Sequence, residues 1–457
     1  MQWILDIIYW FGLLLAAPFL LIKSRRTGKY RTDWSGRLGR VSADVRVILQ
    51  ATPGRPRVLI HCVSVGELLS TRKLVAELLH GHNALLIVIS TTTDTGMAQA
   101  LALYPPRPGA RVVAVRYPLD FSFAVRRFLN AVNPSLIALV ELETWPNFLA
   151  IANRRSIPVQ IINGRMTARS LRRYRLIKPL MRKMLRKVAH ISVQTSEIAD
   201  RFAALGAIPE RMEVIPTMKY DSADFADQIT GANAMAASLG ILPEQRLFVA
   251  GSTGPGEQDI LLTVYGELIK TWPHFRLAIA PRKPEIIGDV TAAIRQAGYE
   301  PILRTMRLDG TGNAVVPIQA GQVIVLDTMG ELKKLYSLAF AIFSGRSLVN
   351  LGGSDMIEAA ALAKPCCFGP YTYNFSDAVA LLTASGAGVT VKNAQEMENL
   401  LREWLSHPEE AAAVGQRARA CLESQRGSSG LYAQGMLKNI SSIAATSNEV
   451  SRYTSKG

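Results

Sequence analysis

Cysteine and histidine are scarce in this sequence of 457 residues, and the usual signs of a metal site are missing. None of its four cysteines forms a C-x-x-C pair; they are Cys62, Cys366, Cys367 and Cys421. The six histidines include one close pair, His80 and His82, which a polar helix end explains. The sequence also contains no Asp-x-Asp motif, the usual sign of a metal-bound nucleotide. We therefore expect a reduced, cytosol-facing protein that needs no metal or other cofactor.

Acidic residues are outnumbered, and recognisable nucleic-acid motifs are missing. The sequence has 36 aspartates and glutamates against 52 lysines and arginines, which gives a net charge of +16. Such an excess favours an anionic partner: nucleic acid, an acidic membrane surface or a phosphorylated substrate. Because no arginine-rich tail accompanies the charge, we expect an anionic membrane surface and phosphate rather than nucleic acid.

One long apolar run lies near the N-terminus, in residues 3–22, and Asp6 is its only charge. As a helix it would extend roughly 30 Å, enough to cross a bilayer. Basic residues follow at once: Lys23, Arg25, Arg26, Lys29 and Arg31. The positive-inside rule keeps that side cytoplasmic. We expect residues 1–26 to be a single inner-membrane anchor with the rest of the chain on the cytoplasmic face. Asp6 and Pro18 leave an interfacial helix as the alternative.

Beyond the anchor, apolar strands and helical patterns alternate in two series. Strands are predicted in the first series at residues 58–62, 85–89, 112–115, 136–140, 159–162 and 190–194. Those of the second are 247–250, 276–280, 323–326, 339–343, 366–369 and 388–391. This alternation predicts doubly wound parallel sheets.

The predicted fold is therefore α/β, with two Rossmann-like domains facing a cleft, as in the GT-B glycosyltransferases. The domains are assigned to residues 27–220 and 240–445, joined by a polar, alanine-rich linker at 221–239. A C-terminal helix is expected to cross back, and residues 446–457 form a polar tail.

The turn SVGE, residues 64–67, follows the first predicted strand and opens a helix. Ligands of open α/β folds bind at this carboxyl edge of the sheet. Glu67 has two interpretations: an acid that stabilises the helix dipole by a few tenths of a kcal/mol, or a general base. The helix N-terminus would also lower the pKa of Glu67, keeping it ionised but weakening it as a base.

Two acids end the predicted strand at 136–140. Strand alternation would point Glu141 and Glu143 the same way and Leu142 the other way. A paired carboxylate either keeps a proton or binds a cation such as lysine. Downstream, the basic and apolar residues of 169–187 form an amphipathic pattern, which suits an acidic membrane or phosphorylated lipid, or simply a solvated helix face.

Several turns of the second half suit an anion. The glycine-rich turn at Gly251–Glu257 offers free amides, although such a loop alone is weak evidence. In GGSDMIE, at 352–358, a helix start near Ser354 would present unpaired N–H groups. Glu358 lies one turn into that helix, placed either for ribose hydroxyls or for the helix dipole.

These motifs together resemble a known family. They are SVGE, the acid pair before WPN, NGRMTARS, MKYD, ST-x-x-GE, APRKPE, DTMGEL, and GG-x-x-x-x-E followed by GPYTYNF. In this order they resemble the lipopolysaccharide Kdo transferases, up to about Leu405. Those are membrane-associated GT-B enzymes that move 3-deoxy-D-manno-oct-2-ulosonic acid (Kdo) from CMP-Kdo to a lipid A precursor. The resemblance implies CMP-Kdo, that lipid and the inner membrane as partners.

The resemblance also implies roles for individual residues. Glu67 matches the general base, and Glu141 and Lys219 match residues that stabilise the transition state. The implied CMP-binding residues are Pro281, Arg282, Met329, Gly330, Glu331, Asp355, Met356, Ile357 and Glu358. The family inverts the anomeric centre, so one base suffices, and Arg282 with helix amides can stabilise the departing CMP without metal.

Departures from the family lie mainly on the donor side. Gly254 and Lys283 stand where histidine is common, Asp355 replaces an asparagine and Met356 a proline. An extra carboxylate near a phosphate should lower affinity unless it turns away. Two alternatives therefore stay open: a GT-B transferase for another nucleotide sugar, and an inactive membrane-bound binding protein. The presence of Glu67 together with the other implied residues argues against the second.

Overall fold

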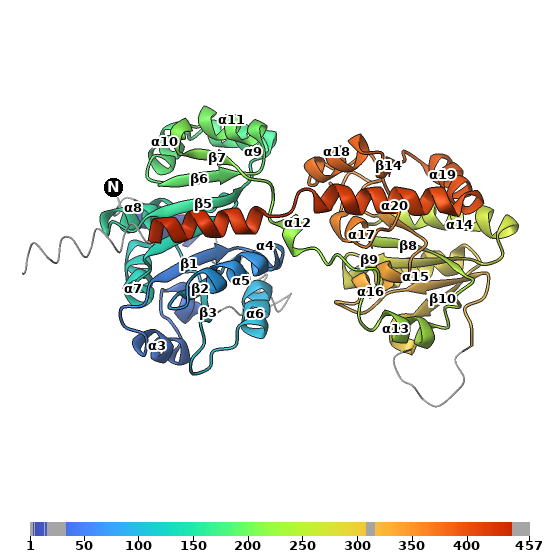
Figure 1. Cartoon of the computed structure of the whole chain (residues 1–457), viewed down its shortest axis with the longest axis horizontal. Coiled ribbons are helices and arrows are strands. Elements are labelled where there is room, and N and C mark those ends of the chain that lie inside the picture. Colours follow the sequence, from blue (N-terminus) through green and yellow to red (C-terminus); the bar gives the residue numbers. More distant parts are fainter. Residues whose placement is uncertain (1–2, 4, 13, 16–32, 308–315, 441–457) are drawn as a thin grey trace, which may run out of the picture. The chain divides into compact units, whose positions relative to one another are not determined.

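The computed structural model describes residue 3 and residues 5–12, 14–15, 33–307 and 316–440. It contains two compact units, each with its own parallel sheet (Figure 1). The first unit comprises Met1–Ser222 and Gly427–Gly457, and the second comprises Ala223–Arg426.

In its described part, the first unit has a seven-stranded sheet in the order β3-β2-β1-β4-β5-β6-β7. Its strands are β1 (Arg57–Cys62), β2 (Leu86–Thr91), β3 (Val112–Arg116), β4 (Leu136–Val140), β5 (Val159–Gly164), β6 (His190–Val193) and β7 (Met212–Val214). Every neighbouring pair is parallel. The order reverses between β1 and β4, which is where ligands bind in such sheets.

Helices cover both faces of this sheet. Those of the first unit are α2 (Trp34–Arg37), α3 (Ala43–Gln50), α4 (Val65–Ser70), α5 (Arg72–Gly81), α6 (Asp94–Leu103), α7 (Ser122–Val132), α8 (Pro146–Arg154), α9 (Ala168–Arg175), α10 (Lys178–Leu185), α11 (Ser196–Ala204) and α12 (Lys219–Ser222). Successive strand residues point to opposite faces. Leu59 therefore joins the core beneath α7 and α8, and Ile60 joins the core beneath α4 and α5.

The second unit repeats this plan, with the order β10-β11-β9-β8-β12-β13-β14 in its described residues. Its strands are β8 (Arg246–Thr253), β9 (Phe275–Pro281), β10 (Glu300–Leu303), β11 (Gln322–Val325), β12 (Ala341–Ser344), β13 (Cys366–Phe368) and β14 (Gly388–Thr390). The helices are α13 (Ala232–Leu239), α14 (Glu257–Thr271), α15 (Ile287–Gln296), α16 (Leu332–Leu338), α17 (Ile357–Ala361), α18 (Ser376–Ala384), α19 (Ala394–Ser406) and α20 (Pro408–Glu423). The alternation of strands and helices read from the sequence is confirmed, but the short edge strands β7 and β10 were missed.

The compact units do not follow the predicted domain boundaries. The helical segment 428–440 crosses back, as expected, and lies on the first unit (Figure 1). Its Tyr432, Met436 and Ile440 are buried in the core that contains Leu68. The stretch 221–239 is not merely a linker either. Ala232, Met235 and Leu239 of α13 bury their side chains within the second unit. In both cases the apolar stripe along the helix determines the unit against which the helix packs. The overall polarity of the segment does not reveal this choice.

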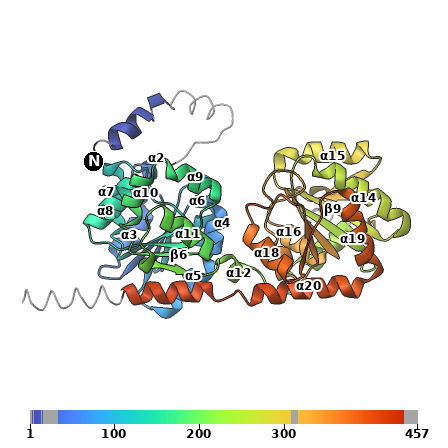
Figure 2. The ribbon, with the colours of Figure 1, turned by 90° about the horizontal axis from the view of Figure 1, so that it is seen from above.

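The predicted anchor lies largely outside the described residues, as does the predicted tail at 446–457. Residues 5–12 are helical, and Figure 2 shows this short helix against the first unit. Within the described ranges, every helix is too short or too polar to pass through a bilayer.

Candidate active site

Glu67 lies in the first turn of α4, where strand β1 gives way to a helix. The hydroxyl of Ser64, the N-cap residue, accepts a hydrogen bond from the Glu67 N–H at 3.4 Å and donates one to Glu67 Oε1 at 2.9 Å. The Val63 N–H donates to Oε2 at 2.8 Å. These bonds are close to a capping box, in which cap and acid satisfy each other. The turn therefore holds the carboxylate at the carboxyl edge of the sheet.

Burial sets the acidity of Glu67. Burial, with a smaller contribution from Glu141, raises the pKa of the carboxyl to about 7, against the lowering effect of the Val63 and Ser64 hydrogen bonds. The lowering expected from the helix N-terminus is therefore outweighed. A carboxyl with a pKa near 7 is matched to general-base work at neutral pH.

Glu141 follows β4 directly and has a left-handed backbone, with φ of 62°. The strand ends at Val140, so the alternation predicted for Glu141 and Glu143 does not extend to them. Glu141 donates its N–H to the Ile162 carbonyl at 3.0 Å. Such a backbone is strained for a residue other than glycine, and strain of this kind gathers at functional sites.

Glu143 is the third carboxyl of this region. Burial raises its pKa, a hydrogen bond from Trp145 Nε1 at 3.2 Å opposes the rise, and Glu141 adds to it. Glu141 thus acts on the pKa of both Glu67 and Glu143. The acid pair that the sequence singled out therefore shares one electrostatic environment with the Glu67 carboxyl.

Lys219 begins α12, a helix that packs against α4 and α5. The preceding residue, Met218, is buried and donates its N–H to Asn163 Oδ1 at 3.4 Å. Asn163 is the penultimate residue of β5 and has a φ of 53°. It is held by a second hydrogen bond, which its N–H donates to the Tyr432 hydroxyl at 3.1 Å. The MKYD and NGRMTARS motifs thus meet at Asn163. The first unit gathers Glu67, Glu141 and Lys219 around one edge of its sheet.

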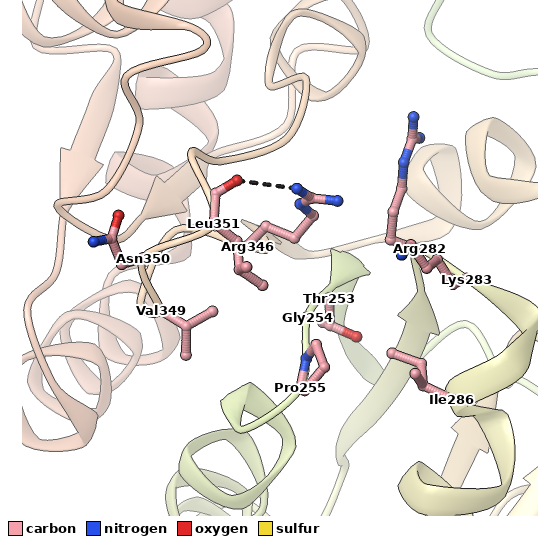
Figure 3. Close-up of a pocket in the computed structure, with 10 residues that line it drawn as sticks. All are labelled: Thr253, Gly254, Pro255, Arg282, Lys283, Ile286, Arg346, Val349, Asn350 and Leu351. Carbon is pink, nitrogen blue, oxygen red and sulfur yellow. Dashed lines mark hydrogen bonds between the residues drawn. The ribbon is translucent and has the colours of Figure 1, made fainter. Parts of the chain in front are cut away.

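A pocket of about 380 Å³ lies at the corresponding edge of the second unit (Figure 3). Its lining includes the cations Arg282, Lys283 and Arg346. Arg346 folds toward the Leu351 carbonyl, to which its Nη2 donates at 3.0 Å, whereas Arg282 extends on the other side of the pocket (Figure 3). Of the predicted donor-binding residues, all of which the structure describes, only Arg282 lines this pocket.

Glu257, which the sequence analysis did not select, organises the floor of this region. Its fully buried carboxylate accepts four backbone hydrogen bonds. Oε2 accepts from Gly254 at 2.8 Å and Arg346 at 2.6 Å, and Oε1 from Ser347 at 2.8 Å and Leu348 at 3.0 Å. The Gly254 amide that seemed free for a phosphate is therefore used by Glu257. The acid within the ST-x-x-GE motif was the signal that could have identified it.

Gly254 itself is closely surrounded. A Cβ at this position would lie 2.6 Å from Leu351 Cδ1. The histidine that the family usually has here would fit only if Leu351 moved. The replacement of the family's usual histidine by Gly254 is thus accompanied by Leu351, whose side chain fills the space.

The turn after β11 is braced by its acid. Burial raises the pKa of Glu331, but hydrogen bonds from Thr328, Arg304 and Lys334 outweigh it and leave the pKa below its ordinary value. Arg304 Nε and Thr328 Oγ1 donate to Oε2 at 3.1 and 2.7 Å. Glu331 is thus occupied by protein partners, while Met329 before it is 80% exposed.

Helix α17 begins at Ile357, later than predicted. Asp355 Oδ1 accepts the Ile357 N–H at 3.0 Å, so the extra carboxylate caps this helix. The side chains of Met356 and Ile357 are buried, and only their backbone could reach a ligand. Burial raises the pKa of Glu358. Lys333, whose Nζ lies 3.7 Å from Glu358 Oε1, partly offsets this rise.

The predicted donor residues follow neighbouring strands. Pro281 ends β9, and Arg282 donates its N–H to the Thr253 carbonyl at 3.1 Å. Met329–Glu331 follow β11, and Asp355–Glu358 follow β12. In the described residues, no three His, Cys, Asp or Glu side chains come together as a metal site.

Comparison with known proteins finds similarity to the Kdo transferases. The model of the 3-deoxy-D-manno-octulosonic-acid transferases (kdotransferase) matches residues 32–222. The 3-deoxy-D-manno-octulosonic acid transferase of Haemophilus influenzae is 28% identical over 420 residues, which is 91% of this chain and 94% of that protein. Over most of its length the chain is similar to the Kdo transferases.

Other relatives agree with this family. The Bordetella pertussis protein of the same name is 29% identical over 407 residues, 88% of this chain and 91% of that protein. A glycosyltransferase of Rickettsia africae shares the fold, with a TM-score of 0.56 and 12% identity, covering 86% of this chain and 99% of that one. The resemblance and the fold of two GT-B-like α/β domains are confirmed.

Proposed function

We propose that the protein is an inverting glycosyltransferase that moves Kdo from CMP-Kdo to a lipid A precursor, lipid IVA, in lipopolysaccharide biosynthesis. The observation that carries this proposal is Glu67. Its carboxyl lies in the SVGE turn of a Kdo transferase homologue and has a pKa of about 7. It is therefore partly ionised at neutral pH and able to accept a proton from a hydroxyl.

The reaction needs one base on the acceptor side. A lipid hydroxyl oxygen attacks the anomeric carbon of Kdo, the bond from that carbon to the CMP phosphate oxygen breaks, and the hydroxyl proton passes to Glu67. CMP leaves with the negative charge. Glu141 and Lys219 are assigned to stabilising the charge that develops on the sugar, because they lie at the same sheet edge as Glu67.

The second unit supplies the donor site in this proposal. Arg282 and Arg346 bring positive charge to the pocket, and a CMP phosphate there would be stabilised without a metal ion. Gly330, with φ of 83°, lets the Met329–Glu331 turn approach the nucleotide closely. Glu358 is assigned to accepting hydrogen bonds from ribose hydroxyls.

We also propose attachment to the cytoplasmic face of the inner membrane through the N-terminal segment. A lipid acceptor requires the enzyme to work at a membrane surface. Supporting features are the apolar run at residues 3–22 and α9, none of whose residues is buried and whose last turn carries Arg172, Arg173 and Arg175. Leu176, which follows, is 85% exposed. Basic and apolar side chains of this kind suit anionic headgroups.

Incubation of the purified protein with CMP-Kdo and lipid IVA, followed by mass spectrometry of the lipid, tests the proposal. Addition of Kdo supports it, and the mass also counts the sugars added. Transfer from a UDP- or GDP-sugar instead would establish the second candidate, which the departures at Gly254 and Asp355 favour. CMP binding with no product from any donor would establish the inactive binding protein.

A further inference from the structure

The N-terminal helix, whose described residues are 3, 5–12 and 14–15, is amphipathic in an unusual sense, because its polar side chains face the protein. Asp6 and Tyr9 are half-buried against the first unit. The apolar side chains point outward, with exposed fractions of 78% for Trp3, 67% for Ile7, 56% for Ile8, 65% for Phe11, 68% for Leu14 and 70% for Leu15. Hydrogen bonds of Asp6 and Tyr9, together with ring contacts of Tyr9 and Trp10 with Phe121, attach this helix to the fold, while most of its apolar face stays exposed.

Asp6 joins the N-terminal helix to the start of two others. Its Oδ1 accepts the Ser122 N–H at 2.9 Å and an Asn147 Nδ2 hydrogen at 3.0 Å, and its Oδ2 accepts the Ser122 hydroxyl at 2.6 Å. Ser122 and Asn147 are buried first-turn residues of α7 and α8. Asp6, the only charged residue of the apolar run, thus forms hydrogen bonds with the folded first unit.

Asp120 completes the same network. It accepts the Tyr9 hydroxyl at 2.9 Å and the N–H groups of Asn147 and Phe148 at 2.9 and 2.8 Å. The N-cap residues of α7 and α8 are Phe121 and Trp145, whose side chains cannot accept a backbone N–H. Asp6 and Asp120 therefore do the capping from a distance. Both acids are held where the two helices begin.

This network borders the candidate site. The loop between β4 and α8, residues 141–145, carries Glu141 and Glu143 and runs directly into Pro146 and Asn147. Asn147 is fixed by Asp6 through its side chain and by Asp120 through its backbone and side chain. The end of the acid-bearing loop is thus held in part by the N-terminal helix.

The outward face of the helix fits a lipid surface. Trp3, Trp10 and Phe11 are exposed aromatic residues of the kind that lie at headgroup level. Phe123, in the first turn of α7, and Trp145, the N-cap residue of α8, are also partly exposed, at 37% and 42%. A protein with a net charge of +16 complements an anionic bilayer. The interface of an anionic bilayer is the environment that suits a helix fixed to the fold by Asp6 and Tyr9 with its apolar face outward.

We infer that the N-terminal helix is a positioning element of the acceptor-side site. It seats its apolar face in an anionic lipid surface and, through Asp6 and Tyr9, holds the loop that carries Glu141 and Glu143. This inference rests on the proposed function for its catalytic consequence, and Asp6 acts as a positioning residue rather than a catalytic one.

The variant Asp6→Leu separates attachment from positioning, because it makes the helix more apolar while removing the contacts to Ser122 and Asn147. In the full chain bound to vesicles of phosphatidylethanolamine and phosphatidylglycerol, vesicle binding is expected to be equal or stronger. We expect kcat for lipid IVA to fall about tenfold or more, with unchanged CMP affinity. The Ser122 amide should exchange its hydrogen faster. Asp6→Asn, which keeps one acceptor oxygen, should restore part of the loss.

Asp44→Leu, which removes an exposed acid from the first turn of α3, is the matched control and should keep the wild-type kcat. An unchanged kcat in Asp6→Leu, or a rate of Ser122 exchange equal to that of the wild type, would overturn the inference. Stronger self-association without vesicle binding would overturn the choice of lipid as partner. If the wild-type chain transfers no Kdo, the proposed function fails, and the exchange and vesicle measurements still decide the inference.

Discussion

Glu67 and Glu257 occupy corresponding places in the two units and have different surroundings. Glu67 lies in the first turn of the helix that follows β1, and Glu257 lies in the first turn of the helix that follows β8. Two donors, the Val63 N–H and the Ser64 hydroxyl, bind the half-buried Glu67. Glu257 is fully buried, and four backbone N–H groups bind it.

The number of donors separates a reactive acid from a structural one. A carboxylate has about four lone-pair sites, and at Glu257 the protein fills them all. At Glu67 acceptor capacity remains, and burial raises the pKa to about 7. The same strand-turn-helix can therefore supply a base in one unit and a brace for the pocket loop in the other.

The largest expected effect is that of Glu67→Gln on catalysis. The amide cannot take the proton of the attacking hydroxyl, so kcat for Kdo transfer should fall by roughly 10²- to 10⁴-fold. CMP affinity, measured by calorimetry, should stay at the wild-type value. Glu77→Gln on α5, which removes only the ion pair with Lys73, is the matched control. A Glu67→Gln enzyme with near-normal kcat would remove the distinction between the two acids.

Glu257→Gln should act on the fold and the donor site instead. Each oxygen of Glu257 accepts two N–H groups, and the NH₂ group that replaces one oxygen cannot accept any. One pair of hydrogen bonds is therefore lost, either that from Gly254 and Arg346 or that from Ser347 and Leu348. We expect the free energy of unfolding of the second unit to fall by about 2–5 kcal/mol and CMP to bind more weakly. Glu267→Gln on the exposed side of α14, where Glu267 pairs with Lys270, is the control. Denaturant unfolding that matches the control would contradict the bracing role.

The pH dependence of transfer tests the state of Glu67. With a pKa of about 7, the ionised base is lost as the pH falls. We expect kcat/KM to drop about tenfold per pH unit below that value. The raised pKa has the opposite effect on stability: its contribution is full below pH 4.5 and is lost as the pH rises through 7. A flat rate profile between pH 5 and 8 would exclude Glu67 as the titrating base.

The smallest expected effect is that of Asp355→Asn. Asparagine can still accept the Ile357 N–H that Asp355 Oδ1 accepts now, so α17 should keep its cap. Loss of one negative charge near the donor site should tighten CMP binding about two- to fivefold at low salt. Equal or weaker binding would show that Asp355 points away from the phosphate.

Local sequence patterns predicted much of this molecule. The short apolar runs that form the buried strands β1 and β8, and the turn before Glu67, are local features of the sequence, and the family motifs gave their order along the chain. What failed depends on distant partners. The N–H groups around Glu257 come largely from residues 89 to 91 positions further along the chain. The packing of Tyr432 in the first unit and the inward orientation of Asp6 likewise depend on contacts between residues that are far apart in the sequence. β10 contains Pro301 at a sheet edge, a poor strand signal.

Single-turnover transfer at saturating CMP-Kdo, measured side by side for Glu67→Gln and Glu257→Gln, tests the central claim most directly. With donor bound in both variants, only the loss of the base should still limit the reaction. The account predicts that Glu257→Gln recovers most of the wild-type rate, while Glu67→Gln forms almost no product. Recovery by Glu67→Gln at saturating donor, with no recovery by Glu257→Gln, would contradict it.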